Sequence, residues 1–218
     1  MKRLSLRDSA DGLPLRVVAI GAHADDIEIG CAGTLLRLAG EHGSLEVDWV
    51  ILTALAERRE EALLSARSLL PDSSEVRVTV HDFRDGHLPW QASEVKDTLA
   101  RLRDSVTPDI VFTHHRGDAH QDHRLLGELA WQLYRDQLIL EYEVPKYDGD
   151  LGVPNVLVTL SEEVAARKVA HLMSAFPSQR DRGWYSEDTL RGVMRLRGLE
   201  SNSVSGWAEA FYCRKLVI

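Results

Sequence analysis

Residues 15–22 read LRVVAIGA, and they are followed at once by HADDIEIG, residues 23–30. The first segment is a continuous apolar run rich in β-branched residues, which is typical of a strand buried on both faces of a sheet. The second segment places one histidine and two aspartates directly after that strand, and residues 27–39 then carry apolar side chains near helical spacing. This order of buried strand, polar turn and helix predicts the first unit of a parallel α/β sheet.

The same alternation continues along the chain and extends the prediction. We expect further strands over residues 47–53, 76–81 and 109–113, and helices over residues 57–70, 93–106 and 119–135, with Ser93 and Asp118 as the N-caps of the last two helices. Residues 142–154 read as a long loop between short strands; they precede two helices, 161–174 and 186–199, and a closing strand, 209–217. The third strand alternates in polarity, which places it near an edge. The prediction is therefore one α/β domain over residues 1–218 with a mainly parallel sheet.

Composition and charge exclude several classes of partner. The chain has 218 residues, of which 26 are Lys or Arg and 34 are Asp or Glu, so its formal net charge at pH 7 is −8. This charge repels nucleic acid and anionic membranes, and no long basic run offsets it. No apolar stretch approaches the ~20 residues that span a bilayer, and the charged start lacks the pattern of a signal peptide. Two cysteines do not make a disulfide framework, so we expect a cytoplasmic protein. With nucleic acid and membranes excluded, the expected partner is a small molecule.

The first group of chemically reactive side chains comes directly after the first strand. His23, Asp25 and Asp26 combine imidazole and carboxylate groups, which bind zinc at about 2.0–2.2 Å. Two ligands three residues apart on one turn reach the same ion, which leaves the other carboxylate free to take a proton. Two alternatives exist: the acidic pair caps a helix, or Gly21 and Gly30 belong to a phosphate-binding turn. The second fails on spacing, because G-x-G-x-x-G is absent.

The second group follows the fourth predicted strand. Residues 113–123 read THHRGDAHQDH and hold four histidines and two aspartates in eleven positions. His120 and His123 lie one helical turn apart and therefore on one face, with Asp122 between them. A single histidine here would be read as a capping or surface residue, and a histidine cluster also binds metals adventitiously. The density of ligand-type side chains nevertheless favours a built site.

The two groups together predict a catalytic metal site. Both end buried strands, and ligands of open parallel sheets bind at the carboxyl ends of the strands. Three protein ligands of His and Asp type, with a fourth position for water, are the pattern of catalytic zinc. A structural zinc would call for four ligands, usually thiolates, whereas Cys31 is a single thiol that we expect inside its helix. The same ligands also suit iron(II), cobalt and manganese, so zinc is a preference.

The residues of both groups resemble the LmbE/PIG-L family of zinc-dependent N-deacetylases. The resemblance rests on AHADDIEIGCAGTL, residues 22–35, and on HQDHR, residues 120–124. Supporting matches are Arg58-x-x-Glu61-Ala62, Asp85-Gly86, Pro108-Asp109, Ser178-Gln179 and AEAF at residues 208–211. The sequence departs from the family pattern at Ala24, where proline is usual, without loss of a ligand type.

The resemblance implies a fold, an activity and a set of roles. The fold is a Rossmann-like α/β sandwich, and the activity is removal of an acetyl group from an N-acetylglucosamine-like amino sugar by zinc-activated water. The implied zinc ligands are His23, Asp26 and His123. Asp25 is implied as the general base, His120 as its protonated partner and Asp122 as the carboxylate that orients His120. Arg58 and Asp85 are implied to hold substrate hydroxyls.

Several alternatives stay open from the sequence. The chain is also compatible with an amide or ester hydrolase acting on a non-sugar natural product, or with a metal-binding module without catalysis. Arg58 and Glu61 lie three apart and would also pair with each other. Residues 142–154 form either a cover over the site or an ordinary connection. Trp184, Tyr185 and Trp207 fit core packing better than sugar stacking, and the oligomeric state is left open, so a homo-oligomer is compatible with the sequence.

Overall fold

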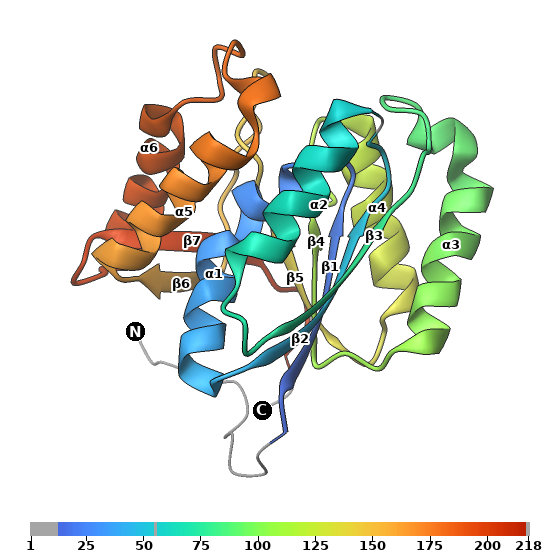
Figure 1. The fold of residues 1–218 in the computed structure, drawn as a ribbon, viewed down its shortest axis with the longest axis horizontal. Coiled ribbons are helices and arrows are strands. Elements are labelled where there is room, and N and C mark those ends of the chain that lie inside the picture. The colour runs from blue at the N-terminus through green and yellow to red at the C-terminus, as the bar shows by residue number, and fades with distance from the viewer. Residues whose placement is uncertain (1–12, 55, 217–218) are drawn as a thin grey trace.

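Seven strands form one sheet in the computed structural model, which describes residues 13–54 and 56–216 (Figure 1). The strands are β1 Leu15–Gly21, β2 Leu45–Ile51, β3 Glu75–Val80, β4 Ile110–His114, β5 Leu138–Tyr142, β6 Val156–Leu160 and β7 Trp207–Tyr212. Their order is β3-β2-β1-β4-β5-β7-β6. Strands β1 to β5 are mutually parallel, whereas β7 runs antiparallel to both of its neighbours. The predicted α/β class with a mainly parallel sheet is confirmed.

The helices begin and end close to their expected positions, with two different N-caps. They are α1 Asp26–His42, α2 Glu57–Leu69, α3 Ala92–Ser105, α4 Gln121–Leu133, α5 Glu162–Ala175 and α6 Glu187–Glu200, with short 3₁₀ helices η2 Leu88–Gln91 and η3 Pro177–Gln179. Gln91 rather than Ser93 precedes α3. His120 rather than Asp118 caps α4, because its side chain accepts the backbone N–H of Asp122. Asp118 is instead occupied with other partners, described below.

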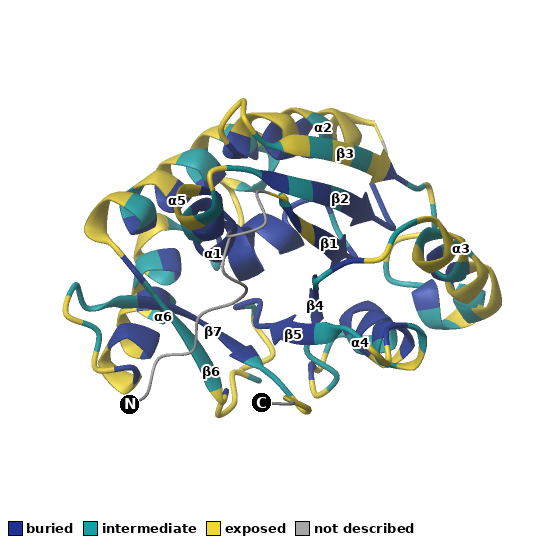
Figure 2. Ribbon diagram, turned by 90° about the horizontal axis from the view of Figure 1, so that it is seen from below, coloured by how far each residue is buried: buried dark blue, intermediate teal, exposed yellow. Residues whose placement is uncertain are grey.

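The sheet separates two apolar cores. Val17 and Ala19 of β1 pack into the core under α1, α2 and α5, whereas Val18 and Ile20 pack into the core under α3 and α4. Every residue of β1 except Arg16 is buried, as the continuous apolar run predicted. Figure 2 shows the buried central strands between the two helical layers. Burial on both faces is the reason that this segment has no polar alternation.

The edges of the sheet differ from expectation in one respect. Strand β3, whose residues alternate in exposure, forms one edge as predicted. The last strand, expected over residues 209–217, spans Trp207–Tyr212 and lies inside the sheet between β5 and β6; Val217 lies outside the described residues. Cys31 is buried within α1, and its thiol donates to the Ile27 carbonyl oxygen at 3.3 Å. Among the described residues, no helix is both long and apolar enough to cross a membrane.

The strand order reverses between β1 and β4. The two strands are neighbours, but the chain leaves β1 into α1 on one face of the sheet and leaves β4 toward α4 on the other face. Their carboxyl ends therefore diverge at the point where the strand order reverses, the usual ligand position in open α/β sheets. Segments 23–30 and 113–123 both begin at the carboxyl ends of these two strands.

Candidate active site

Three ligand-type atoms from the two strand ends converge. His23 Nδ1 lies 3.1 Å from Asp26 Oδ2 and 3.1 Å from His123 Nε2, and the third distance, between Asp26 Oδ2 and His123 Nε2, is 3.5 Å. The edge of a tetrahedron built on bonds of 2.0–2.2 Å is about 3.3–3.6 Å. The 3.5 Å distance lies within this range and the two 3.1 Å distances lie just below it, so the three atoms are close to the spacing of tetrahedral coordination of one ion. The donor set and its geometry fit a divalent metal.

The predicted ligand histidines are held by carboxylates on their other ring nitrogens. His123 Nδ1 contacts Asp118 Oδ2 at 3.1 Å, and His23 Nε2 contacts Asp85 Oδ1 at 3.0 Å. Such pairs fix the tautomer and orientation of metal-binding histidines. Burial lowers the pKa of His23, but Asp26, Asp122 and Asp85 outweigh burial and hold it well above its usual value. Burial raises the pKa of Asp118, but His123 and Lys146 pull it below its usual range.

His114, the last residue of β4, is a member of the cluster to which the sequence alone gave no role. Its Nε2 lies 3.1 Å from Asp26 Oδ2 and accepts the Ala22 backbone N–H at 3.0 Å. Its ring stacks on that of His123 with centroids 3.9 Å apart. Burial, followed by the charge of His123, lowers the pKa of His114 to about 4, so the ring is neutral. Asp26, His114 and His123 therefore form a second group with metal-ligand spacing.

Asp25 has the environment expected of a proton acceptor. Its side chain is buried, its Oδ1 accepts a hydrogen bond from Arg58 Nη2 at 2.6 Å, and its Oδ2 has no hydrogen-bond partner among the residues that the structure describes. Burial raises the pKa of Asp25, while the Arg58 guanidinium opposes that rise. A buried carboxylate oxygen without a hydrogen-bond partner destabilises the fold, so its presence points to a functional role. The free Oδ2 is therefore the chemically notable atom of this residue.

The structure does not bring the Asp122 carboxylate to His120. Asp122 Oδ2 accepts the Gly86 backbone N–H at 2.8 Å, and Asp122 Oδ1 accepts that of Leu88 at 3.0 Å. Only the backbone N–H of Asp122 meets His120, at Nδ1. Because two amides occupy it, the buried carboxylate anchors the β3–α3 connection rather than His120. Burial and then the charges of His123 and His23 lower the pKa of His120; its expected role as the protonated partner stays a prediction.

The two residues implied to hold substrate hydroxyls contact the site itself. Arg58 Nη2 is on Asp25, and its Nη1 donates to Ser178 Oγ at 3.2 Å. The pairing of Arg58 with Glu61 is looser, at 3.8 Å, because Glu61 accepts both the amide and the hydroxyl of Ser178. Asp85 meets His23 through one oxygen, yet its side chain is 79% exposed. Asp85 is therefore the more accessible of the two.

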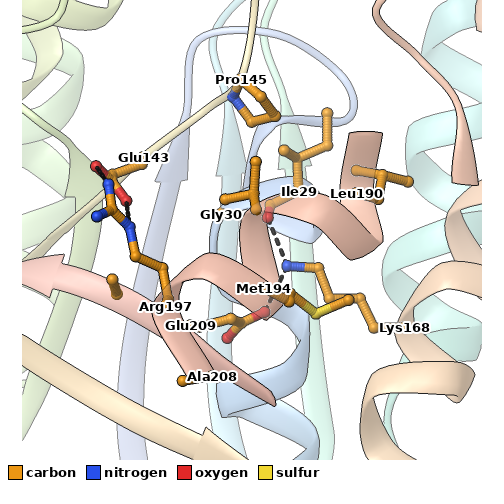
Figure 3. Close-up of a pocket in the computed structure, with 12 residues that line it drawn as sticks. Ile29, Gly30, Glu143, Pro145, Lys168, Leu190, Met194, Arg197, Ala208 and Glu209 are labelled. Carbon is orange, nitrogen blue, oxygen red and sulfur yellow. Dashed lines mark hydrogen bonds and ion pairs between the residues drawn. The ribbon is translucent and has the colours of Figure 1, made fainter. Parts of the chain in front are cut away.

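Two buried charged residues contact the backbone of helix α1 (Figure 3). Lys168 of α5 donates to the Ile29 carbonyl oxygen at 2.6 Å and pairs with Glu209 of β7. Glu209 in turn accepts the Gly33 backbone N–H at 2.8 Å. Ile29 O and Gly33 N are the two ends of one i→i−4 step of the helix. The pair thus fixes the turn that follows Asp26, and it gives a physical reason for the AEAF motif.

Segment 143–155 is tied down on both sides rather than detached. Arg197 of α6 contacts Glu143 at 2.7 Å (Figure 3), and it donates to the Gly152 carbonyl oxygen at 3.1 Å. Lys146 contacts Asp118 at 3.0 Å and Asp150 at 2.6 Å. The segment is therefore a fixed wall next to the site.

The three aromatic residues of the C-terminal third pack as expected. Tyr185 belongs to the core under α1, α2 and α5, and its hydroxyl donates to the Leu172 carbonyl oxygen at 2.7 Å. Trp184 and Trp207 are partly buried against the same core. Core packing is confirmed as their main role.

Known proteins are similar to this chain in sequence and in fold. The family model for PIG-L, GlcNAc-PI de-N-acetylase, matches residues 18–134. The uncharacterized deacetylase YaiS of Escherichia coli K12 is 30% identical over 172 residues, which cover 72% of this chain and 88% of that protein.

Solved structures show the same architecture. The N,N'-diacetylchitobiose deacetylase of Pyrococcus horikoshii has a TM-score of 0.71 at 24% identity and covers 96% of this chain and 87% of its own. GalB, the 4-carboxy-2-hydroxymuconate hydratase of Pseudomonas putida KT2440, has a TM-score of 0.67 at 17% identity and covers 94% of this chain and 98% of its own. Because a deacetylase and a hydratase share this fold, the fold alone does not identify the reaction. The family match and the similarity to YaiS show that this chain belongs to the PIG-L family of deacetylases.

Proposed function

We propose that this chain is a metal-dependent hydrolase that removes the acetyl group from the nitrogen of an N-acetylglucosamine-like amino sugar. The observation that carries the proposal is the convergence of His23 Nδ1, Asp26 Oδ2 and His123 Nε2 within 3.1–3.5 Å of one another. Asp25, the neighbour of Asp26, has a buried carboxylate oxygen without a hydrogen-bond partner in the described part of the chain. The family description names a GlcNAc derivative, which supports an amino-sugar amide as the target.

The ligands in this proposal are His23, Asp26 and His123. Two imidazole nitrogens and one carboxylate oxygen are a donor set that suits catalytic zinc, and iron(II), cobalt and manganese accept the same donors. A divalent ion bound there supplies Lewis-acid polarisation and lowers the pKa of water. His114 stands behind Asp26, where its neutral ring completes the buried wall of the site.

The remaining side chains move protons and hold groups in place. Asp25 accepts the proton of the attacking water at its free Oδ2, while Arg58 holds its Oδ1. His120 accepts the Asp122 N–H at Nδ1, so its Nε2–H is left to donate a hydrogen bond to the carbonyl oxygen, and the proton that Asp25 takes from water passes to the leaving nitrogen. Asp85, whose side chain is largely exposed, offers its second oxygen to a sugar hydroxyl.

Acetate release from a panel of N-acetyl amino sugars tests the function, with and without a chelator. We expect release that the chelator abolishes and added divalent metal restores. If the protein hydrolysed a matched ester but no amide of any amino sugar, a non-sugar hydrolase would be the better assignment. If it bound metal and turned over neither, the chain would be a binding module without catalysis.

A further inference from the structure

Lys146 lies in the segment that joins β5 to β6, outside both metal motifs, yet it contacts Asp118, which in turn contacts His123. Its Nζ is 3.0 Å from Asp118 Oδ1, and the two side chains are only 11% and 4% exposed. The same Nζ contacts both carboxylate oxygens of Asp150, at 2.7 and 2.6 Å. A nearly buried ammonium shared between two carboxylates is more than a surface pair, whose contribution to stability is usually small.

Asp118 connects this ammonium to a proposed metal ligand. Its Oδ1 faces Lys146 and also accepts the His120 backbone N–H at 2.8 Å, whereas its Oδ2 takes His123 Nδ1 at 3.1 Å. With Nδ1 committed to Asp118, His123 presents Nε2 to His23, 3.1 Å away. The contacts thus form one continuous relay from Lys146 through Asp118 to the His123 nitrogen that faces the proposed ion.

Removal of the ammonium would disturb the orientation of Asp118. Asp150 accepts the Ala119 backbone N–H at 2.7 Å, so its carboxylate is fixed on the same turn as Asp118. Without Lys146, these two carboxylates face each other with no cation between them and repel. Asp118 then turns away from Asp150, and the hydrogen bond that fixes the ring of His123 is weakened.

The segment has anchors other than Lys146, whose ammonium also contacts the Val144 carbonyl oxygen at 3.4 Å. Arg197 holds Glu143 near one end of the segment (Figure 3) and the Gly152 carbonyl oxygen near the other. Asn155 is paired with the backbone of Cys213 through both ends of its amide, at 2.9 and 2.8 Å. A change confined to the Lys146 side chain therefore removes the charge without releasing the segment.

We propose that Lys146 is a positioning residue of the metal site, which acts through Asp118 to fix the ring of His123 and so raises the affinity for the divalent ion. The inference rests on the proposed function, because it takes His123 as a ligand. It assigns a role in the metal site to a residue of the β5–β6 connection, which contains neither of the two metal-binding motifs. Outer partners of metal ligands commonly change metal affinity by about 10–100-fold.

The test compares metal affinity in Lys146→Met, Lys146→Arg and the control Lys96→Met. Lys96 is an exposed residue of α3, and within the described chain its only hydrogen-bond partner is Gln132, at 3.2 Å. The control Lys96→Met therefore removes the same charge away from the site. Co²⁺ is titrated into metal-free protein, and the dissociation constant and visible spectrum are recorded together with thermal unfolding of the metal-free form. We expect about 10-fold weaker binding in Lys146→Met, recovery in Lys146→Arg and no change in Lys96→Met.

A double-mutant cycle shows whether the effect passes through Asp118. In an Asp118→Asn background, Lys146→Met should cause little further loss of Co²⁺ affinity. If Lys146→Met fails to fold, Lys146→Gln is used in the same cycle. The inference is overturned if the Lys146 variants bind Co²⁺ as tightly as the wild type, or if the losses add fully in the cycle.

The wild-type measurement separates this inference from the proposed function. If the wild type binds one Co²⁺ and releases acetate while the Lys146 variants match it, only the role of Lys146 is wrong. If the wild type binds no divalent ion, the proposed function and the inference both fail.

Discussion

The Nδ1 atom of His23 lies 3.1 Å from the Nε2 atom of His123, although the two residues are 100 positions apart. His23 follows β1 and His123 lies in the first turn of α4, which follows β4, so their meeting depends on the parallel pairing of β1 and β4. Two imidazole nitrogens this close, beside the Asp26 carboxylate, form a site that can bind one shared ion, and the chemistry of the site depends on that ion. The predictions below address each part of that site.

His123→Ala should abolish metal binding. The substitution removes one of three converging donors and leaves the remaining pair too weak to retain an ion through purification. Metal content of the purified protein, measured by elemental analysis, should fall to near zero. His42→Ala, at the far end of α1, is the matched control and should retain the wild-type metal content.

Asp25→Asn should keep the metal and lose turnover. The amide preserves the volume of the side chain but cannot accept a proton at the position of Oδ2. Loss of a general base costs about 10²–10⁴-fold in rate. Elemental analysis and acetate release on one preparation check both halves, and an unchanged rate would show that another group takes the proton.

Arg58→Met should shift the pH dependence of the reaction rather than weaken substrate binding. Burial already raises the pKa of Asp25, and the Arg58 guanidinium is the charge that opposes this rise. Without it the pKa of Asp25 rises further, so the carboxylate is protonated at a pH where the wild type is ionised. The acid limb of the kcat/KM profile should therefore move to higher pH.

A direct contact between Arg58 and substrate hydroxyls would give a different result. In that case, KM would rise with kcat nearly unchanged, and the acid limb would stay in place. Arg58→Lys keeps the charge and should move the acid limb less than Arg58→Met does.

Gly30→Ala should destabilise the protein, and Gly40→Ala in the same helix should not. A Cβ on Gly30 would lie 2.2 Å from the Tyr142 ring, whereas one on Gly40 would meet nothing within 4 Å. Overpacking of this kind typically costs about 1–3 kcal/mol, while alanine in place of an exposed helical glycine gains roughly 0.5–1 kcal/mol. Urea unfolding of both variants measures the difference, and equal stabilities would contradict the close packing of α1 on Tyr142.

The parts of the site that follow from the sequence are those encoded locally. The run LRVVAIGA predicts a strand buried on both faces, and the residues that follow it are placed at the carboxyl end by chain order alone. The same holds for His120 and His123, which follow β4. Adjacent parallel strands then bring the two groups together, as the structure shows.

The parts that do not follow from the sequence depend on partners from distant segments. Asp118 looks like a helix cap, but Lys146 and His123 occupy it. Asp122 looks like a partner of its neighbour His120, but the amides of residues 86 and 88 occupy its carboxylate. Spacing along one helix cannot show such competition, because the competing donors belong to other elements of the fold.

The central claim is that one divalent ion, held by His23, Asp26 and His123, is required for deacetylation. The most direct measurement determines metal content and acetate release together in the wild type, in chelator-treated wild type and in Asp26→Asn. The account predicts one ion per chain and release of acetate in the wild type, neither in Asp26→Asn, and recovery of release when metal is returned to the stripped wild type. Full acetate release from metal-free protein would contradict it.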